Sequence, residues 1–133
     1  MENSTPIYVI DTHPLVWYFE DSPRLSSAAK QAFEQIEHGS ALGVVPTIVL
    51  AEIVHLADKK KIPINISETI ARLKQATGFG IVSLDLMVIL LMVPLKTYEI
   101  HDRVIVATAK SFEAYLITKD EHIQKSGAVP CIW

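Results

Sequence analysis

Short apolar runs of strand type alternate with stretches of helical spacing along this chain, and that alternation limits the possible folds more than any other feature. The clearest runs are IYVI at 7–10, LGVV at 42–45, residues 80–83 and YLIT at 115–118. A weaker run, VPCIW, contains Pro130, which confines a strand to a sheet edge. Strands that alternate with helices predict an α/β fold with one parallel sheet of four to five strands flanked by helices.

Helix signals fill the intervals between these runs. The predicted helices cover about 13–20, a segment from Ser26 or Ser27 to Gly39, 47–60, a segment from Ser67 to Gly78, 86–93 after Asp85, a segment that Asp102 opens, and 121–126. Serine and aspartate are favoured at helix starts because their side chains accept from free backbone N–H groups. No repeat or linker divides the chain, so residues 1–133 are expected to form one domain.

Composition excludes several classes of protein. The chain has 133 residues and one cysteine, Cys131, which rules out an intramolecular disulfide and fits a reducing compartment. The start, MENSTP, lacks the features of a signal peptide. The longest apolar run, Leu86 to Leu95, is well short of the roughly 20 residues that span a bilayer. A cytoplasmic protein without membrane contact is therefore expected.

The chain is nevertheless apolar for its size, with 50% hydrophobic residues and a mean hydropathy of +0.28. Such an excess indicates a partner interface. The run LMVILLMV at 86–93 is either a covered core helix or that interface, and the interface is the favoured interpretation. The net charge of −3 means that nucleic-acid binding would depend on local basic clusters or on a metal ion. The cluster Lys59 to Lys61 is interpreted as solvated rather than specific.

Four acids stand at positions that such a fold could bring together: Asp11, Glu52, Asp102 and Asp120. Asp11 follows the first strand and Asp120 lies just past the fourth, and the carboxyl ends of parallel strands share one edge of the sheet. Each has a simpler alternative, since Asp11 and Asp102 can cap helices and Asp120 can be a turn residue. A capping aspartate stays ionised in the helix dipole, so capping and cation binding are compatible.

Glu52 is the hardest of the four to explain by structure alone. It is the only acid in an almost wholly apolar stretch, and a helix that is apolar all round is mostly buried. A lone buried carboxylate is costly unless it is neutralised, paired or metal-bound. The alternative is that Glu52 points to solvent or pairs with Lys59. Glu52 and His55 also have E-x-x-H spacing, but a di-iron bundle needs two such motifs on four helices.

Four carboxylates at one point would suit a hard divalent cation. Mg²⁺ and Mn²⁺ prefer oxygen ligands, and crowded carboxylates repel one another until a cation compensates. A bound ion can lower the pKa of a water molecule and stabilise charge on a phosphoryl group, which fits phosphodiester hydrolysis. A phosphatase with Asp11 as nucleophile is an alternative, weakened because His13 replaces the second aspartate of D-x-D-x-T. No serine-hydrolase, paired-cysteine, phosphate-loop or zinc spacing is present.

The chain resembles PIN-domain proteins, and specifically the VapC-type toxins of bacterial toxin–antitoxin pairs. The resemblance covers nearly the full length and rests on four segments in order, VIDTHPLVW, VPTIVLAEI, HDRVIVATAK and LITKDEHI. It implies a PIN fold and a Mg²⁺- or Mn²⁺-dependent endoribonuclease whose catalytic, metal-binding acids are Asp11, Glu52, Asp102 and Asp120.

The resemblance also implies partners and further site residues. Family members cleave RNA, are inhibited by a small antitoxin protein and commonly form homodimers. Thr118 matches a hydroxyl position beside the fourth acid, where it would position water or phosphate. Arg103 would meet a phosphate or an antitoxin acid, or else form a surface salt bridge. A non-catalytic PIN-like module that binds RNA or a protein is the alternative function.

Overall fold

Five parallel strands form one sheet in the computed structural model, which describes residues 4–133. They are β1 Ile7–Ile10, β2 Leu42–Pro46, β3 Phe79–Val82, β4 Tyr115–Ile117 and β5 Cys131–Ile132. Their order across the sheet is β3-β2-β1-β4-β5, so β1 is central and β5, which directly follows Pro130, lies at an edge. The predicted α/β fold with a parallel sheet is therefore confirmed.

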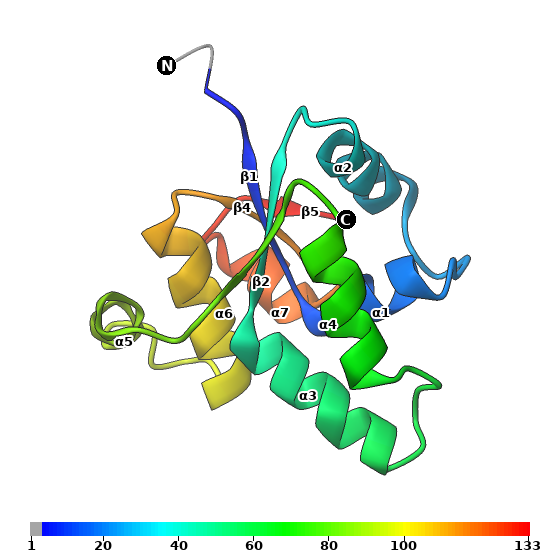
Figure 1. Cartoon of the computed structure of the whole chain (residues 1–133). Coiled ribbons are helices and arrows are strands. Elements are labelled where there is room, and N and C mark those ends of the chain that lie inside the picture. Colours follow the sequence, from blue (N-terminus) through cyan, green and yellow to red (C-terminus); the bar gives the residue numbers. More distant parts are fainter. Residues whose placement is uncertain (1–3) are drawn as a thin grey trace.

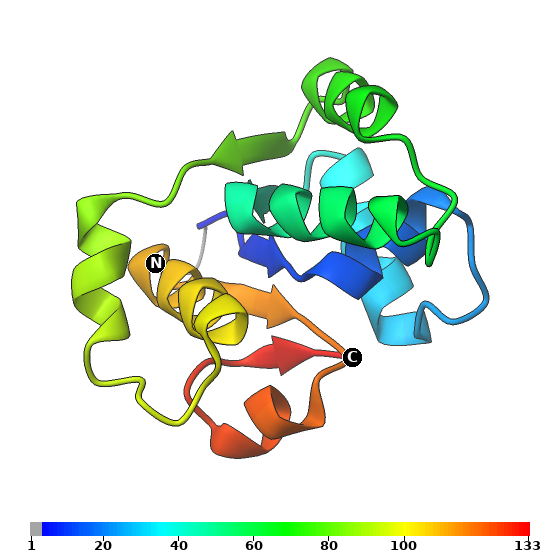
Figure 2. The same cartoon turned by 90° about the horizontal axis from the view of Figure 1, so that it is seen from below.

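Helices cover both faces of this sheet (Figure 1). They are α1 Thr12–Phe19, α2 Ser27–Glu37, α3 Thr47–Asp58, α4 Ile66–Gln75, α5 Leu86–Met92, α6 Ile100–Ser111 and α7 Glu121–Ser126. In Figures 1 and 2, α6 packs on one side with α5 outside it, and α1, α2 and α4 lie on the other. No helix within residues 4–133 is long and apolar enough to cross a membrane.

Helix starts follow the sequence signals in some places and depart from them in others. Ser26 caps α2 and Asp85 caps α5, as predicted. The cap of α4 is Asn65, whose side chain accepts from Glu68 N at 3.1 Å, so the prediction of Ser67 was wrong. Helix α6 begins at Ile100, and Asp102 lies within its first turn rather than at its cap.

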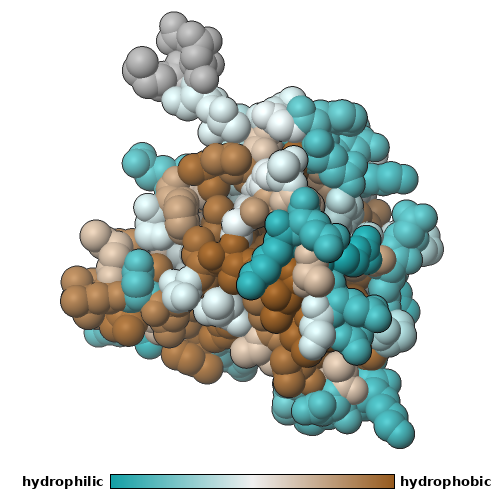
Figure 3. All heavy atoms as spheres, in the orientation of Figure 1, coloured by the Kyte–Doolittle hydropathy of each residue, from teal (hydrophilic) through white to brown (hydrophobic). Residues whose placement is uncertain are grey.

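Two apolar helices are only partly covered by the rest of the chain. In α3, Val49 and Ile53 are buried but Val54 is 40% exposed, so the expectation that this helix is mostly buried holds for only one of its faces. The reason is that α3 leaves the end of β2 and extends past the sheet edge (Figure 1). In α5, Val88 is buried, whereas Leu86 is 71% exposed and Leu90 60%. Figure 3 shows hydrophobic atoms gathered over α5 at the left of the view.

The buried centre of the sheet determines where Asp11 and the segment after β4 lie. Val9, Ile10, Leu116 and Ile117 are fully buried at the centre of the sheet. At the end of β1, the Asp11 N–H donates to the Ile117 carbonyl of β4 at 3.0 Å. Because all strands are parallel, Asp11 and the segment that follows β4 emerge at the same edge.

Candidate active site

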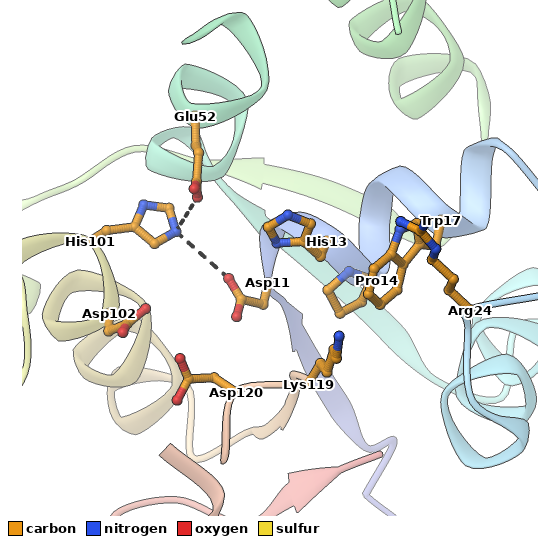
Figure 4. Close-up of a pocket in the computed structure, with 10 residues that line it drawn as sticks. All are labelled: Asp11, His13, Pro14, Trp17, Arg24, Glu52, His101, Asp102, Lys119 and Asp120. Carbon is orange, nitrogen blue, oxygen red and sulfur yellow. Dashed lines mark ion pairs between the residues drawn. The ribbon is translucent and has the colours of Figure 1, made fainter. Parts of the chain in front are cut away.

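The four acids singled out in the sequence line one pocket of about 480 Å³ at the carboxyl edge of the sheet (Figure 4). Asp11 comes from the end of β1, Glu52 from α3, Asp102 from the first turn of α6 and Asp120 from the start of α7. Residues from four separate parts of the chain thus face one space. Their roles in catalysis and metal binding remain predictions.

Asp11 is held at both of its carboxylate oxygens. Oδ1 accepts from the Thr12 backbone N–H at 2.7 Å, which is the predicted helix cap. Oδ2 accepts from the Thr118 hydroxyl at 2.8 Å. Thr118 is fully buried, and its oxygen also accepts from the Asp120 N–H at 3.0 Å. Thr118 therefore links the first and fourth acids and fixes the position of the Asp11 carboxylate.

Glu52 points into the pocket rather than toward Lys59 or bulk solvent (Figure 4). Its Oε1 accepts from the Thr12 hydroxyl at 2.7 Å and lies 2.7 Å from His101 Nε2. The hydrogen bond from His101 outweighs the effect of burial and lowers the pKa of Glu52 to about 2. Glu52 is thus an ionised, hydrogen-bonded carboxylate in this arrangement.

His101 is a site residue that the sequence patterns do not single out. Its Nε2 lies between Glu52 and Asp11, 3.7 Å from Asp11 Oδ1. Burial alone would lower the pKa of His101, but the two carboxylates more than offset this and raise the pKa to about 10. The ring is therefore protonated at neutral pH. The signal in the sequence is its position directly before Asp102 in HDRVIVATAK, since the histidines show no zinc spacing that would single one of them out.

Asp102 and Asp120 form the other part of the acidic wall. Burial, followed by the charges of Asp120 and Asp11, raises the pKa of Asp102 to about 6. Asp120 Oδ1 accepts from the Ile123 N–H at 2.9 Å, so Asp120 caps α7 while it lines the pocket. The charges of Asp120 and Asp11 add to the effect of burial, and a bound cation would relieve this repulsion between carboxylates.

The donor set suits a hard cation, although the side chains are not drawn together around one point. Within residues 4–133, no three Asp, Glu, His or Cys side chains already form a group close enough to hold an ion. One reason is that Glu52 Oε1 is paired with His101 Nε2 at 2.7 Å. All four acids offer oxygen, the ligand type that Mg²⁺ and Mn²⁺ prefer.

Arg103 lies elsewhere. Its Nε donates to the Met92 carbonyl at 2.8 Å and its Nη2 to the Val93 carbonyl at 3.1 Å, both at the end of α5. The guanidinium therefore joins α6 to α5 and does not line the carboxylate pocket. The predicted contact of Arg103 with substrate stays a prediction, and this arrangement does not support it.

This architecture is shared with several proteins of known structure. A search of curated proteins gave no match. Among solved structures, VapBC2 from Rickettsia felis bound to a promoter DNA fragment is similar with a TM-score of 0.68 and 16% identity, over 94% of this chain and 96% of that chain. A toxin–antitoxin complex from Klebsiella pneumoniae gives 0.65 and 22%, over 92% and 94%. FitAcB from Neisseria gonorrhoeae gives 0.62 and 20%, over 93% and 95%.

At these identities the solved structures establish a shared fold. The family assignment comes from the sequence itself, because the model of the PIN domain matches residues 8–128. That range includes all but the first residue of β1, the residues of the carboxylate pocket and helices α1 to α7. This chain belongs to the PIN domain family.

Proposed function

We propose that this protein is a metal-dependent endoribonuclease that hydrolyses RNA phosphodiester bonds, and that it is the toxin of a toxin–antitoxin pair. The observation that carries the proposal is the meeting of Asp11, Glu52, Asp102 and Asp120 at one pocket. Burial, with a further contribution from the charges of Asp120 and Asp11, raises the pKa of Asp102 to about 6. Four carboxylates lining one pocket would repel RNA unless a cation intervened.

In this proposal Asp11 and Asp102 are the main ligands of Mg²⁺ or Mn²⁺, and Glu52 and Asp120 complete the site directly or through water. The bound ion would lower the pKa of the attacking water and stabilise charge on the phosphoryl group. Glu52 or Asp120 accepts a proton from that water, which adds to phosphorus as the bridging oxygen of the RNA departs. Thr118 and Thr12 hold the carboxylates of Asp11 and Glu52 in place.

The proposed partners follow from the same family. The similar Klebsiella pneumoniae structure is a toxin–antitoxin complex, which supports a small antitoxin as the inhibitor of this chain in the cytoplasm. The exposed apolar side chains of α5 support pairing with a second copy of the chain.

The test is RNA cleavage by Asp11→Asn and Asp102→Asn, each compared with Asp58→Asn, which changes an exposed acid at the end of α3. Cleavage by the wild type should require Mg²⁺ or Mn²⁺. Each pocket variant should lose about 100-fold or more, since roughly 3 kcal/mol of transition-state stabilisation disappears with a metal ligand. The control should cleave normally. Equal cleavage by all three folded variants would contradict the assignment.

One observation favours the alternative of a non-catalytic module that binds RNA or protein: His101 already pairs with Glu52 in the position of a cation. Thermal unfolding with added Mn²⁺ separates the two functions. A nuclease site that binds the ion must be stabilised by it, and the midpoint should rise with Mn²⁺ concentration. An unchanged midpoint together with RNA binding would favour the module.

A further inference from the structure

The carboxylate pocket has a second side of opposite character. Across from the acids it is lined by His13, Arg24 and Lys119, with Pro14 and Trp17 between them (Figure 4). Lys119 Nζ lies 5.2 Å from the centre of the Trp17 ring, and the His13 ring centre lies 5.6 Å from it. One pocket thus joins an acidic wall to a basic and aromatic wall.

This basic side continues beyond the pocket. A neighbouring cavity of about 420 Å³ shares His13, Trp17 and Arg24 with it and adds Lys61. Leu56 and Ile62 give this second cavity apolar lining, and Glu20 is its single acid. We use the name basic groove for the continuous surface lined by His13, Trp17, Arg24, Lys61 and Lys119.

The cations of the basic groove are available to a ligand. Within residues 4–133, the ion pairs shorter than 4.0 Å are those of His101, so Arg24, Lys61 and Lys119 have no carboxylate partner. All three side chains are exposed. In a protein with a net charge of −3, their gathering beside the acidic pocket is a local feature and not a general excess of basic residues.

We propose that the basic groove binds the single-stranded part of an RNA substrate on one side of the cleaved bond. The inference rests on the proposed function, which puts the cleaved phosphate at the four acids. The phosphates on either side of the cleaved phosphate are not bound to the metal ion, and the four acids repel them. The strand is therefore expected to leave the pocket past Lys119, Arg24 and Lys61. The Trp17 ring is only 6% exposed, whereas the His13 ring is exposed, and an exposed aromatic ring within a basic groove is typical of sites for single strands, whose bases are free to stack.

Continuity of the groove with the carboxylate pocket favours RNA over an acidic peptide. A strand cleaved at the acids has to leave the pocket along one of its walls, and this wall is the basic one. An acidic segment of a protein partner has no phosphodiester bond to place at the acids. Effects on inhibition by a protein are therefore an outcome of the test and not part of the proposal.

The experiment uses Arg24→Ala, Lys61→Ala and the double variant, with Lys74→Ala on α4 as the matched exposed control. Cleavage of a single-stranded RNA is measured with Mn²⁺ at several salt concentrations. Each groove variant should raise KM about 3- to 10-fold, and the dependence of log kcat/KM on log salt should become shallower by about 0.7 per lost phosphate contact. The control should match the wild type. A duplex of the same sequence should be a poor substrate for every form.

Separate outcomes distinguish failure of this inference from failure of the proposed function. Unchanged KM and salt dependence in the folded double variant, with normal cleavage, would overturn the basic groove and leave the nuclease intact. Should the wild type cleave nothing, binding of a fluorescein-labelled single strand by wild type and double variant decides, since the groove requires weaker binding by the variant. Weaker inhibition by a protein partner with unchanged RNA kinetics would also overturn the proposal.

Discussion

The contact between His101 and Glu52 depends on pH, and its sign follows from the two pKa values. The pKa of His101 is raised from 6.5 in the unfolded chain to about 10 in the folded protein. Its stabilising contribution is therefore complete below about pH 6.5 and is lost as pH rises toward 10. The pKa of Glu52 is lowered from 4.5 to about 2, so its contribution is present above about pH 4.5 and is lost as pH falls toward 2.

This contact predicts how the metal-free protein responds to alkali. Between pH 6.5 and 10, the unfolding midpoint of the wild type should fall more steeply than that of His101→Gln, because only the wild type releases the His101 proton. Thermal unfolding in a chelator at several pH values gives the comparison. The difference between the two proteins cancels other groups that titrate in this range. Parallel pH profiles would show that His101 is not held as an imidazolium.

At the residue scale, the sequence identified the acids more readily than the groups that hold them. Asp11 and Asp120 follow strands, and parallel strands bring such positions to one edge. Glu52 stood out because a charge in an apolar segment needs a reason. Thr12 and His101 could not be ranked in this way, because their contacts with Glu52 join residues from three separate helices.

At the element scale, Arg103 links two helices. Its two hydrogen bonds to the carbonyls of Met92 and Val93 tie the end of α5 to α6, next to Asp102. Arg103→Gln should lower the unfolding midpoint by roughly 3–10 °C, because a charged donor to free helix carbonyls contributes on the order of 1–2 kcal/mol. Hydrogen exchange should increase most in α5.

Lys110→Gln on the exposed face of α6 is the control for this variant and should leave the midpoint unchanged. Cleavage kinetics then separate the two roles considered for Arg103. A structural link predicts lower stability with a nearly unchanged KM for RNA. A raised KM at unchanged stability would instead support the contact with substrate that family resemblance implied.

Helix boundaries show where local sequence rules succeed and where they fail. Asp85 caps the helix it precedes, and of the two adjacent candidates Ser26 and Ser27 it is Ser26 that caps α2. At α6 the rule favoured Asp102, yet the helix starts after Glu99, which has no side-chain capping bond. Because α6 begins at Ile100, His101 lies within the helix and its side chain reaches Glu52. A helix that began at Asp102 would not have predicted this contact.

At the scale of the whole molecule, the parallel sheet was predictable but the order of its strands was not. Alternation of strands and helices established the α/β class. The central place of β1 between β2 and β4 depends on pairings across more than a hundred residues, such as Ile10 with Ile117, which no local pattern encodes. That central place brings Asp11 within reach of Thr118, and the neighbouring Thr12 within reach of Glu52.

The exposed face of α5 carries more apolar side chains than a protein without a partner would be expected to leave in contact with water. Leu86, Met87, Ile89, Leu90 and Val93 are each 47% exposed or more, on a helix that has no charged side chain. Water contact with so many adjacent apolar groups is unfavourable, and burial against an identical face relieves both copies at once. A dimer of ordinary size hides about 800 Å² per partner, which α5 and its surroundings must supply.

The apolar face therefore predicts the state of the protein in solution. The wild type should have twice the 14.8 kDa mass of the chain in light scattering, and Leu86→Glu combined with Leu90→Glu should give the single-chain mass. Two buried carboxylates in an apolar interface have no partners, so association becomes unfavourable. Leu42→Glu, at the start of β2 and 48% exposed, is the control and should stay dimeric. A monomeric wild type, or a dimeric double variant, would reassign this face to another partner, for which the antitoxin is the first candidate.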